Sequence, residues 1–230
     1  MRLRVVVYNV RGFRGGVEAV AGVAGAYEPD LVLLNESGRR GSLRRFSAAM
    51  GMEAAADPRS FLKRRVKNAV LVRPPWRVVS HRLHRFRSSG RFYPRGALIA
   101  QVGRSGHRVW AISVHLGLSA EERRRHAEEA TDLTLGMHGP IVIGGDFNEA
   151  PNRMAATWIS DRLWDAWLLG GDVSGETYPA QVPTARIDYL FVSTGIRVER
   201  VVVPDGPKVR AASDHRPVVA ELTVGEESTR

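Results

Sequence analysis

The stretch Ile141-Val142-Ile143-Gly144-Gly145-Asp146-Phe147-Asn148 carries the clearest fold signal in the chain. Its first three residues are a continuous apolar run, which is typical of a strand buried on both faces. The paired glycines allow other backbone to approach closely, and Asp146 and Asn148 follow them with a bulky phenylalanine in between. The stretch therefore predicts a buried strand that ends in two polar side chains.

The same pattern recurs at other apolar segments. Asn9 follows the β-branched run Leu3–Tyr8, and Glu36 comes shortly after Leu31–Leu34. Turn residues separate further strand-like segments, which raises the expected number of strands. These segments are Asn68–Val72, Arg77–Leu83, Gly96–Val102, Arg108–Val114, Ile187–Val192, Val198–Val203 and Pro217–Leu222.

Four segments have helical character. They are Val17–Tyr27, Ser42–Met50, Ser119–Leu135 and Arg153–Trp167, the last with a break near Ser160. Strands are therefore numerous, and helices are inserted between them. Two sheets packed face to face with helices outside would cover the apolar face of every element. A single doubly wound sheet is the alternative, and the strand-rich middle of the chain disfavours it.

The composition narrows the class of protein. The chain has 230 residues, no cysteine, and 43% hydrophobic residues, so a large core can form without disulfides and thiolate chemistry is excluded. No apolar run approaches the roughly 18 residues of a membrane-spanning helix, and the N-terminus lacks the layout of a signal peptide. We expect a soluble, cytoplasmic, monomeric protein without stable membrane insertion.

Positive charge is concentrated in one part of the chain. The formal net charge is +10, and 12 lysines and arginines but no acidic residue occur between Arg59 and Arg95. This favours an anionic partner such as nucleic acid, and the alternative is a solvated arginine-rich face. Interleaved aromatic residues suggest a groove that follows phosphates. Its expected members are Arg82, His84, Arg85, Arg87, Arg91 and Arg95, with Phe86, Phe92 and Tyr93.

Polar residues at strand ends form the candidate site. Strands aligned in a sheet present their ends on one edge, where ligand sites of α/β proteins gather. Each residue alone also fits a turn, a loop or a satisfied buried group. Together they are four carboxylates, two asparagines and two histidines, namely Glu36, Asp146, Asp188, Asp214, Asn9, Asn148, His115 and His215. Carboxylate oxygens without sulfur select Mg²⁺ or Mn²⁺, which suits hydrolysis of a phosphoester.

These motifs, in this order, resemble the endonuclease/exonuclease/phosphatase superfamily of DNase I-like metal-dependent phosphohydrolases. The matching pieces extend from residue 8 to residue 217. They are Tyr8-Asn9, Pro29 to Glu36, Ser113-Val114-His115-Leu116, Gly145-Asp146-Phe147-Asn148, Arg186-Ile187-Asp188-Tyr189 and Ser213-Asp214-His215-Arg216-Pro217. The resemblance implies an α/β four-layer sandwich of two packed, mainly antiparallel sheets flanked by helices. It also implies one catalytic domain over residues 1–223, followed by a polar tail over 224–230.

The resemblance also implies a role for each residue. Glu36, Asn9 and Asp214 would hold the metal. Asp146 would align or deprotonate the attacking water, Asn148 would position the phosphate, and Asp188 would orient His215. His215 would stabilise the transition state, and His115 would donate a hydrogen bond to the phosphate or the leaving oxygen. Arg95 could reach the phosphate, and the alternative is a plain arginine beside a strand.

Two departures from the family pattern stand out. Asn35 occupies the place of the glutamine that usually precedes the metal-binding glutamate. No acidic residue occurs between Asp57 and Glu121, so the glutamate that partners the equivalent of His115 in DNase I is missing.

The expected activity is Mg²⁺- or Mn²⁺-dependent phosphodiester hydrolysis on nucleic acid. The first alternative is a phosphatase or phosphodiesterase that acts on a lipid or a small phosphorylated metabolite with the same site. The second is a non-catalytic phosphate-binding module, which the complete set of acids, asparagines and histidines disfavours.

Overall fold

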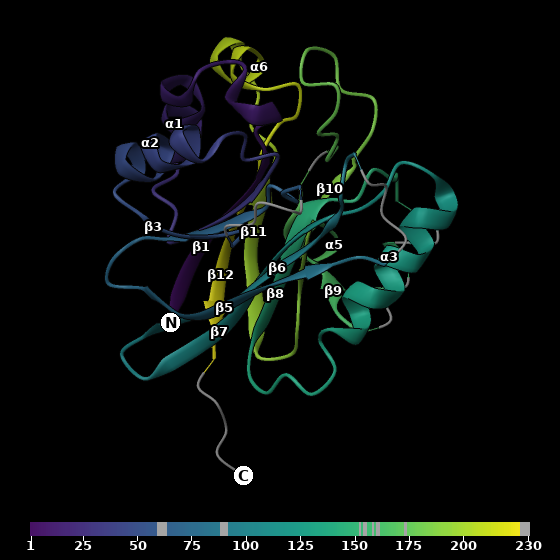
Figure 1. Cartoon of the computed structure of the whole chain (residues 1–230). Helices are drawn as coiled ribbons and strands as arrows, with labels where there is room; N and C mark the ends of the chain where they lie inside the picture. Colours follow the sequence, from purple (N-terminus) through teal and green to yellow (C-terminus); the bar gives the residue numbers. More distant parts are fainter. Residues whose placement is uncertain are drawn as a thin grey trace.

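The computed structural model describes residues 1–58, 64–87, 92–151, 153, 156–157, 159, 162–172 and 174–225. Its strands form two sheets of six strands each (Figure 1). In the first sheet the strand order is β11-β12-β1-β2-β4-β3. These strands are β1 (Arg2–Asn9), β2 (Leu31–Asn35), β3 (Glu53–Ala56), β4 (Ala69–Val72), β11 (Ile196–Val202) and β12 (Val218–Val224).

The second sheet has the order β5-β6-β7-β8-β10-β9. Its strands are β5 (Arg77–Arg85), β6 (Gly96–Arg104), β7 (His107–His115), β8 (Ile141–Asp146), β9 (Trp164–Asp165) and β10 (Asp188–Val192). Each sheet has one parallel pair at its centre, β1 with β2 and β7 with β8, and its other pairs are antiparallel. The predicted mainly antiparallel sheets are therefore confirmed.

Three apolar clusters separate four layers. Alternate residues of β1 point to opposite faces: Val5 and Val7 pack between the two sheets, whereas Val6 packs on the other face against helices. That helical layer consists of α1 (Val17–Gly25), α2 (Arg40–Met50) and α6 (Pro207–Ala212). The third cluster joins the outer face of the second sheet to α3 (Ala120–Asp132).

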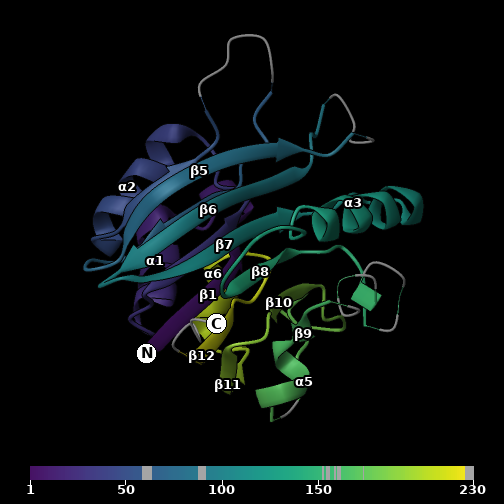
Figure 2. The same cartoon turned by 90° about the horizontal axis from the view of Figure 1, so that it is seen from below.

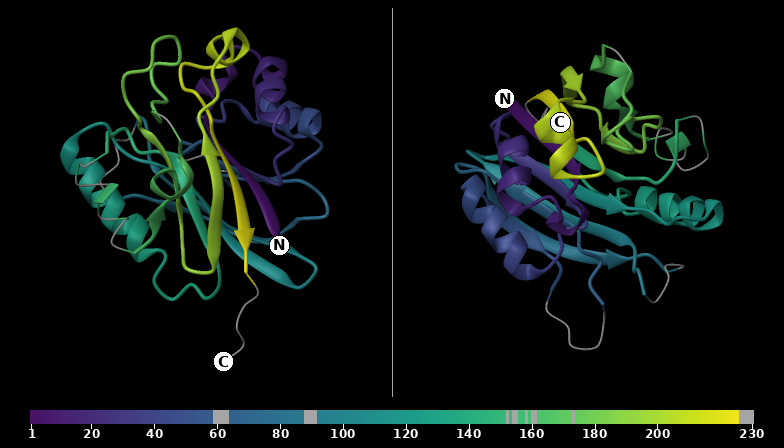
Figure 3. Two further views of the ribbon diagram at one scale, coloured as in Figure 1. Left: turned by 180° about the vertical axis from the view of Figure 1, so that it is seen from behind. Right: turned by 90° about the horizontal axis from the view of Figure 1, so that it is seen from above.

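Figures 2 and 3 show α1 and α2 together on one side of the sheets and α3 on the other. The four-layer α/β sandwich is thus confirmed, and the doubly wound alternative is wrong. None of the helices in the described ranges is long and apolar enough to cross a membrane.

Several elements differ from the sequence prediction. The strand β3 and the helix α6 were not anticipated. The expected helix Arg153–Trp167 is wrong at its end, where Trp164 and Asp165 form β9 and pair with β10. Asp165 ends this strand and caps the short helix α5 (Ala166–Gly170), because its carboxylate accepts a hydrogen bond from the Trp167 amide. The same carboxylate also accepts from Arg186 Nη2 at 2.7 Å. Part of the predicted helix, including Ser160, lies outside the described residues.

The end of the chain differs by one residue from the expected boundary. Strand β12 continues through Val224, which is buried and pairs with Ile196. The first residue of the predicted tail therefore belongs to the first sheet, and residues 226–230 lie outside the described part of the chain.

A buried histidine on α3 anchors the loop that follows β7. His126 is fully buried, and its Nδ1 accepts from the Gly117 amide at 3.1 Å. Its ring stacks on the Phe86 ring, with 4.6 Å between the two ring centroids. Burial lowers the pKa of His126 to about 4, although Glu122 and Glu129 oppose the shift. The folded protein thus holds this ring neutral where the unfolded chain would protonate it.

This predicts a loss of stability in mild acid. Because the folded pKa of His126 lies below the unfolded value, its contribution is complete above about pH 6.5 and falls as the pH drops towards 4. Between pH 7 and 5 the loss of unfolding free energy is about 2 kcal/mol, measured by urea unfolding. His126→Leu should remove that part of the pH dependence. His81→Leu, at an exposed position on β5, is the control, and equal slopes for both variants would refute the assignment.

Candidate active site

Strand register brings three predicted site residues together on the second sheet. In the parallel pair of β7 and β8, His115 lies opposite Asp146. In the antiparallel pair of β8 and β10, Asp188 also lies opposite Asp146. Asp146 therefore has one of these residues on each side, at the end of β8 and at the same edge of the sheet.

The two glycines before Asp146 are needed for this packing. Gly145 has φ +150°, and a Cβ there would collide with the Val114 carbonyl oxygen. A Cβ on Gly144 would come within 2.8 Å of both the Tyr189 carbonyl oxygen and Val7 of the other sheet. The glycine pair therefore lets the end of β8 sit between its neighbours, as the sequence predicts.

The Asp146 carboxylate is the centre of the site. It is 2% exposed, and its Oδ2 accepts from Asn9 Nδ2 at 2.8 Å. The same oxygen lies 3.3 Å from His115 Nε2 and 3.8 Å from His215 Nε2. Burial alone would raise the pKa of Asp146, but the two imidazoles outweigh it and hold the pKa well below the usual range. Asp146 is therefore an ionised acceptor surrounded by donors.

A second buried carboxylate orients His215. Asp188 Oδ2 accepts from His215 Nδ1 at 2.8 Å, and the Asp188 side chain has no measurable exposure. Burial opposes charge on the ring, but the carboxylates of Asp188, Asp146 and Asp214 outweigh it and raise the pKa of His215 to about 10. His215 is an imidazolium at neutral pH, and its Nε2–H faces the centre of the site. The ring of Tyr178 packs against the His215 ring, with 4.8 Å between the two ring centroids.

An arginine takes the place of the missing acidic partner of His115. Arg95 Nη1 lies 2.8 Å from His115 Nδ1 and 2.6 Å from Nε2. An arginine N–H can only donate, so a ring nitrogen must accept. The ring nitrogen that accepts from Arg95 cannot also donate, so the ring keeps one N–H for Asp146 or for a bound phosphate. This is the opposite electrostatic setting from a histidine paired with glutamate.

Glu36 faces a cavity of about 620 Å³ that Arg95 and His115 also line. Its backbone has φ 52°, and its carbonyl oxygen accepts from the Gly12 amide at 2.8 Å. Within the described part of the chain, the Glu36 carboxylate has no hydrogen-bond or ion-pair partner. The predicted principal metal ligand is therefore open to the cavity.

Asn148 and Asp214 border the site. The Asn148 amide donates to Asp146 Oδ1 at 2.9 Å, and its side chain donates to the Leu116 carbonyl oxygen at 3.1 Å. Asp214 Oδ2 lies 3.0 Å from Arg11 Nε, so this carboxylate is already paired at the surface. Sequence reasoning missed Arg11, which lies two residues after Asn9 and whose amide also donates to Asn9 Oδ1.

A polar network under the site was also missed. Asn35 Nδ2 donates to the Val114 carbonyl oxygen at 2.7 Å, and Asn35 Oδ1 accepts from the Asp146 amide at 2.8 Å. Asn68 and Ser113 continue the network, and all three side chains are fully buried. Asn35 belongs to the first sheet and Asp146 to the second, so the network fixes the two sheets relative to each other. The sequence signal for this network was an asparagine next to a buried strand: Asn35 directly follows Leu31–Leu34, and Asn68 directly precedes Ala69–Val72.

The donor set fits a divalent cation. Glu36 offers a free carboxylate, whereas Asn9 Oδ1 and Asp214 each keep an unused lone pair beside the bond from Arg11. A second group of ligand atoms, from Asp146, Asp188 and His215, lies within 4.8 Å of one another. In that group the His215 ring already occupies Asp188 through Nδ1, and Asn9 already donates to Asp146, so the open Glu36 carboxylate is the better candidate.

Comparison with known proteins identifies a matching family and several similar structures. A model of the endonuclease/exonuclease/phosphatase family matches residues 6–215. A Bacteroides vulgatus protein described as an endonuclease/exonuclease/phosphatase is 18% identical, with a TM-score of 0.83 over 97% of this chain and 99% of that one. A mannosyl-6-phosphatase of Bacteroides thetaiotaomicron is 19% identical, with a TM-score of 0.81 over 96% and 99%.

The third structure is TDP2 of D. rerio in complex with a single-strand DNA product, which is 17% identical, with a TM-score of 0.79 over 97% and 99%. A comparison with curated proteins gives no match. At these identities the solved structures establish a shared fold. Because the family match covers nearly the whole chain, the protein belongs to the endonuclease/exonuclease/phosphatase family.

Proposed function

We propose that the protein is a divalent-metal-dependent phosphodiesterase that cleaves nucleic acid by in-line attack of water. Members of its family are hydrolases that act on phosphoesters. The observation that carries the proposal is the buried Asp146 carboxylate with Asn9, His115 and His215 around it, next to the cavity of Glu36. This set combines an acceptor for water with the charged His215 ring as a donor for phosphate.

The metal would be held by Glu36, with Asn9 and Asp214 as further oxygen ligands. Oxygen ligands without sulfur favour Mg²⁺ or Mn²⁺. When bound, such an ion polarises a phosphate oxygen and lowers the pKa of its water.

The side chains supply the remaining chemistry. The low pKa of Asp146 makes it a weak base, so its role is to orient the attacking water by accepting a hydrogen bond. The His215 imidazolium donates to the phosphate oxygens, where negative charge grows in the transition state. Asp188 holds this ring in place through Nδ1. Asn148 and Arg95 would contact the phosphate, and His115 would donate to it from the ring nitrogen that does not accept from Arg95.

Charge supports a nucleic-acid substrate over a small monoester. The cavity has seven basic residues in its wall and Glu36 as the acid among its described lining residues. A polyanion would neutralise this excess, whereas a single phosphate would leave most of it unpaired.

The proposal predicts that cleavage requires both the metal and Asp146. Wild-type protein with Mg²⁺ should cleave a single-stranded oligonucleotide and bis(nitrophenyl) phosphate, and EDTA should abolish both activities. Asp146→Asn should lower kcat/KM at least about 100-fold, because the neutral amide loses the charge that orients the water. Activity that persists in EDTA would refute the metal dependence. Rapid hydrolysis of nitrophenyl phosphate, with nuclease activity no higher than that of Asp146→Asn, would instead favour a phosphatase.

A further inference from the structure

The cavity of Glu36 extends into a strongly basic pocket. Beyond Arg95 and His115, its wall includes cationic side chains from three separate segments. They are Arg14, Arg39, Arg40, Arg64, Arg65 and Lys67. Only three of these, Arg64, Arg65 and Lys67, belong to the basic segment between Arg59 and Arg95. The fold therefore assembles a positive pocket that the linear charge pattern does not reveal.

Most of this charge has no counterion. Among these six residues, within the described ranges, only Arg65 has a carboxylate at ion-pair distance, with Asp57 Oδ2 3.9 Å from its Nε. Arg65 Nη1 donates to the Gly38 carbonyl oxygen at 2.7 Å, whereas its buried Nε and Nη2 have no hydrogen-bond partner. Burial lowers the pKa of Arg65, Asp57 opposes the shift, and Arg40 adds to it. A set of cations held together in this way is suited to an anionic ligand.

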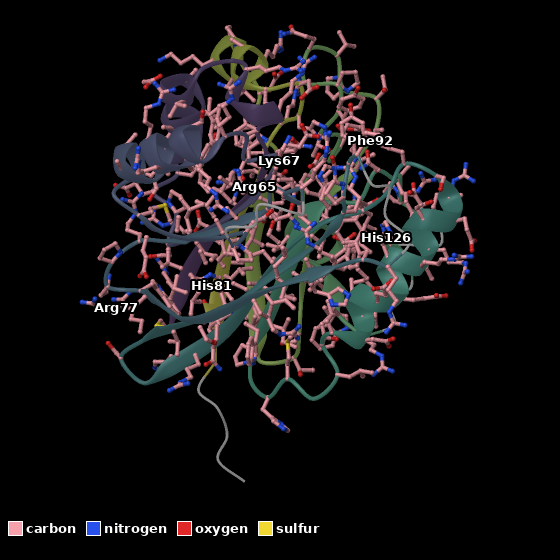
Figure 4. The ribbon with its side chains drawn as sticks, viewed as in Figure 1. Arg65, Lys67, Arg77, His81, Phe92 and His126 are labelled. Atoms are coloured by element: carbon pink, nitrogen blue, oxygen red, sulfur yellow. The ribbon has the colours of Figure 1, made fainter. Side chains whose placement is uncertain are left out.

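Two exposed aromatic rings stand beside these cations. Phe92 is 66% exposed and Tyr93 is 78% exposed, and the Arg64 guanidinium lies 5.2 Å from the centre of the Phe92 ring. The same two rings border a neighbouring hollow of about 390 Å³ on the side of Leu118. Figure 4 shows Arg65, Lys67 and Phe92 towards the same end of the sheets, with Arg77 at the opposite end. Exposed rings next to arginines are the usual means of binding unpaired bases.

We propose that this pocket binds a second phosphate of a single-stranded nucleic acid, next to the phosphate that is attacked. This inference rests on the proposed function. Arg64, Arg65 and Lys67 hold that phosphate, and an adjoining base stacks on Phe92 or Tyr93. A base can stack on a side chain in this way only when it is unpaired, so the pocket favours single strands over duplexes.

The test is a binding measurement in which cleavage cannot occur. A labelled single-stranded octanucleotide is titrated in EDTA and followed by fluorescence anisotropy at several salt concentrations. The double variant Arg64→Gln/Lys67→Gln should weaken binding about tenfold or more. It should also reduce the slope of log K against log salt by up to about 1.4, the value for two lost phosphate contacts on a single strand.

The matched control removes the same charge elsewhere. Arg77 and Arg108 both lie opposite Gly103, at the far end of the second sheet. Arg108 is seven residues before His115, or roughly 23 Å along the strand. Arg77→Gln/Arg108→Gln should leave the affinity within about twofold. Equal losses in the two double variants, or a duplex of the same sequence binding as tightly as the single strand, would overturn the inference.

Failure of the pocket and failure of the proposed enzymatic function give different results. Wild-type hydrolysis of bis(nitrophenyl) phosphate with Mg²⁺ tests the chemistry, and anisotropy in EDTA tests the pocket. Selective binding without any hydrolysis would support the pocket and refute the enzyme. Hydrolysis without selective binding would refute the pocket alone.

Discussion

His215→Ala is expected to lower kcat for phosphodiester cleavage roughly 1000-fold while KM changes little. The imidazolium is held by Asp188 at 2.8 Å and keeps its Nε2–H free to donate, 3.8 Å from Asp146 Oδ2. Its charge matters most when the phosphate oxygens gain negative charge, so its loss raises the barrier more than it weakens substrate binding. Steady-state kinetics on a single-stranded oligonucleotide measures this separation.

Removal of the ring also leaves a buried carboxylate without its partner. Asp188 has no measurable side-chain exposure, so His215→Ala should destabilise the fold by about 3 kcal/mol or more. Asp188→Asn avoids that problem, because a neutral amide replaces the carboxylate while the ring remains. We expect its kcat to fall by about 100-fold, since the ring loses the charge that favours its imidazolium form. Circular dichroism and thermal unfolding of both variants separate misfolding from lost chemistry.

His84 provides a matched control. Its Nε2 lies 2.9 Å from Glu129 Oε2, so it is also a histidine paired with a carboxylate, but at the side of α3. His84→Ala should leave kcat within about twofold of wild type, as expected for a partly exposed surface pair. If His215→Ala retained a third of the wild-type kcat, or lost no more than His84→Ala, the assigned role of His215 would be wrong.

The sequence predicts most of this site because strand ends are local features. Apolar runs followed by Asn9, Asp146 or His115 mark the same edge of the sheets, and the parallel pairing of β7 with β8 places His115 beside Asp146. The list of strands marks this edge, whereas the pairing that sets His115 and Asp188 beside Asp146 comes from the structure. The four-layer fold follows from strands that are apolar on both faces, because each sheet must then be covered twice.

Contacts between distant segments could not be predicted. The absence of an acid near His115 in the sequence does not indicate that Arg95 would occupy that side of the ring. The expected aromatic groove also divides: Phe86 is buried against His126, whereas Phe92 and Tyr93 are exposed at the cavity. Both faces of such a segment carry rings and charges, so periodicity alone does not assign them. Arg91 lies outside the described residues.

Asn35→Leu is expected to destabilise the fold strongly. The substitution keeps a similar volume but leaves the Val114 carbonyl oxygen and the Asp146 amide unpaired in a fully buried place. Asn68 Oδ1, 3.2 Å from Asn35 Nδ2, would lose a donor as well. At roughly 1–3 kcal/mol for each buried group, the free energy of unfolding should fall by about 4 kcal/mol. Urea unfolding measures this, and the melting temperature should fall by roughly 10 °C.

Two further variants isolate the cause. Gln101→Leu also removes an amide, but that amide accepts a solvent-exposed hydrogen bond from Arg108 on a half-buried side chain, so the cost should stay within about 0.5 kcal/mol. Asn35→Gln restores the residue that the family pattern favours and keeps the amide, yet adds a methylene to a site closed by Gly145 and Val114. Overpacking should cost about 1–3 kcal/mol, so this variant lies between wild type and Asn35→Leu.

The consequence for activity follows from the position of Asn35 between the sheets. Its Oδ1 holds the backbone of Asp146 on the second sheet, while the next residue, Glu36, carries the free carboxylate from the first. The folded Asn35→Leu protein should therefore lose kcat at a temperature where it is still native, because the distance between Glu36, the proposed metal ligand, and Asp146, the proposed water-orienting acid, is no longer fixed. Full activity in the native variant would show that this network stabilises the sandwich without setting the geometry of the site.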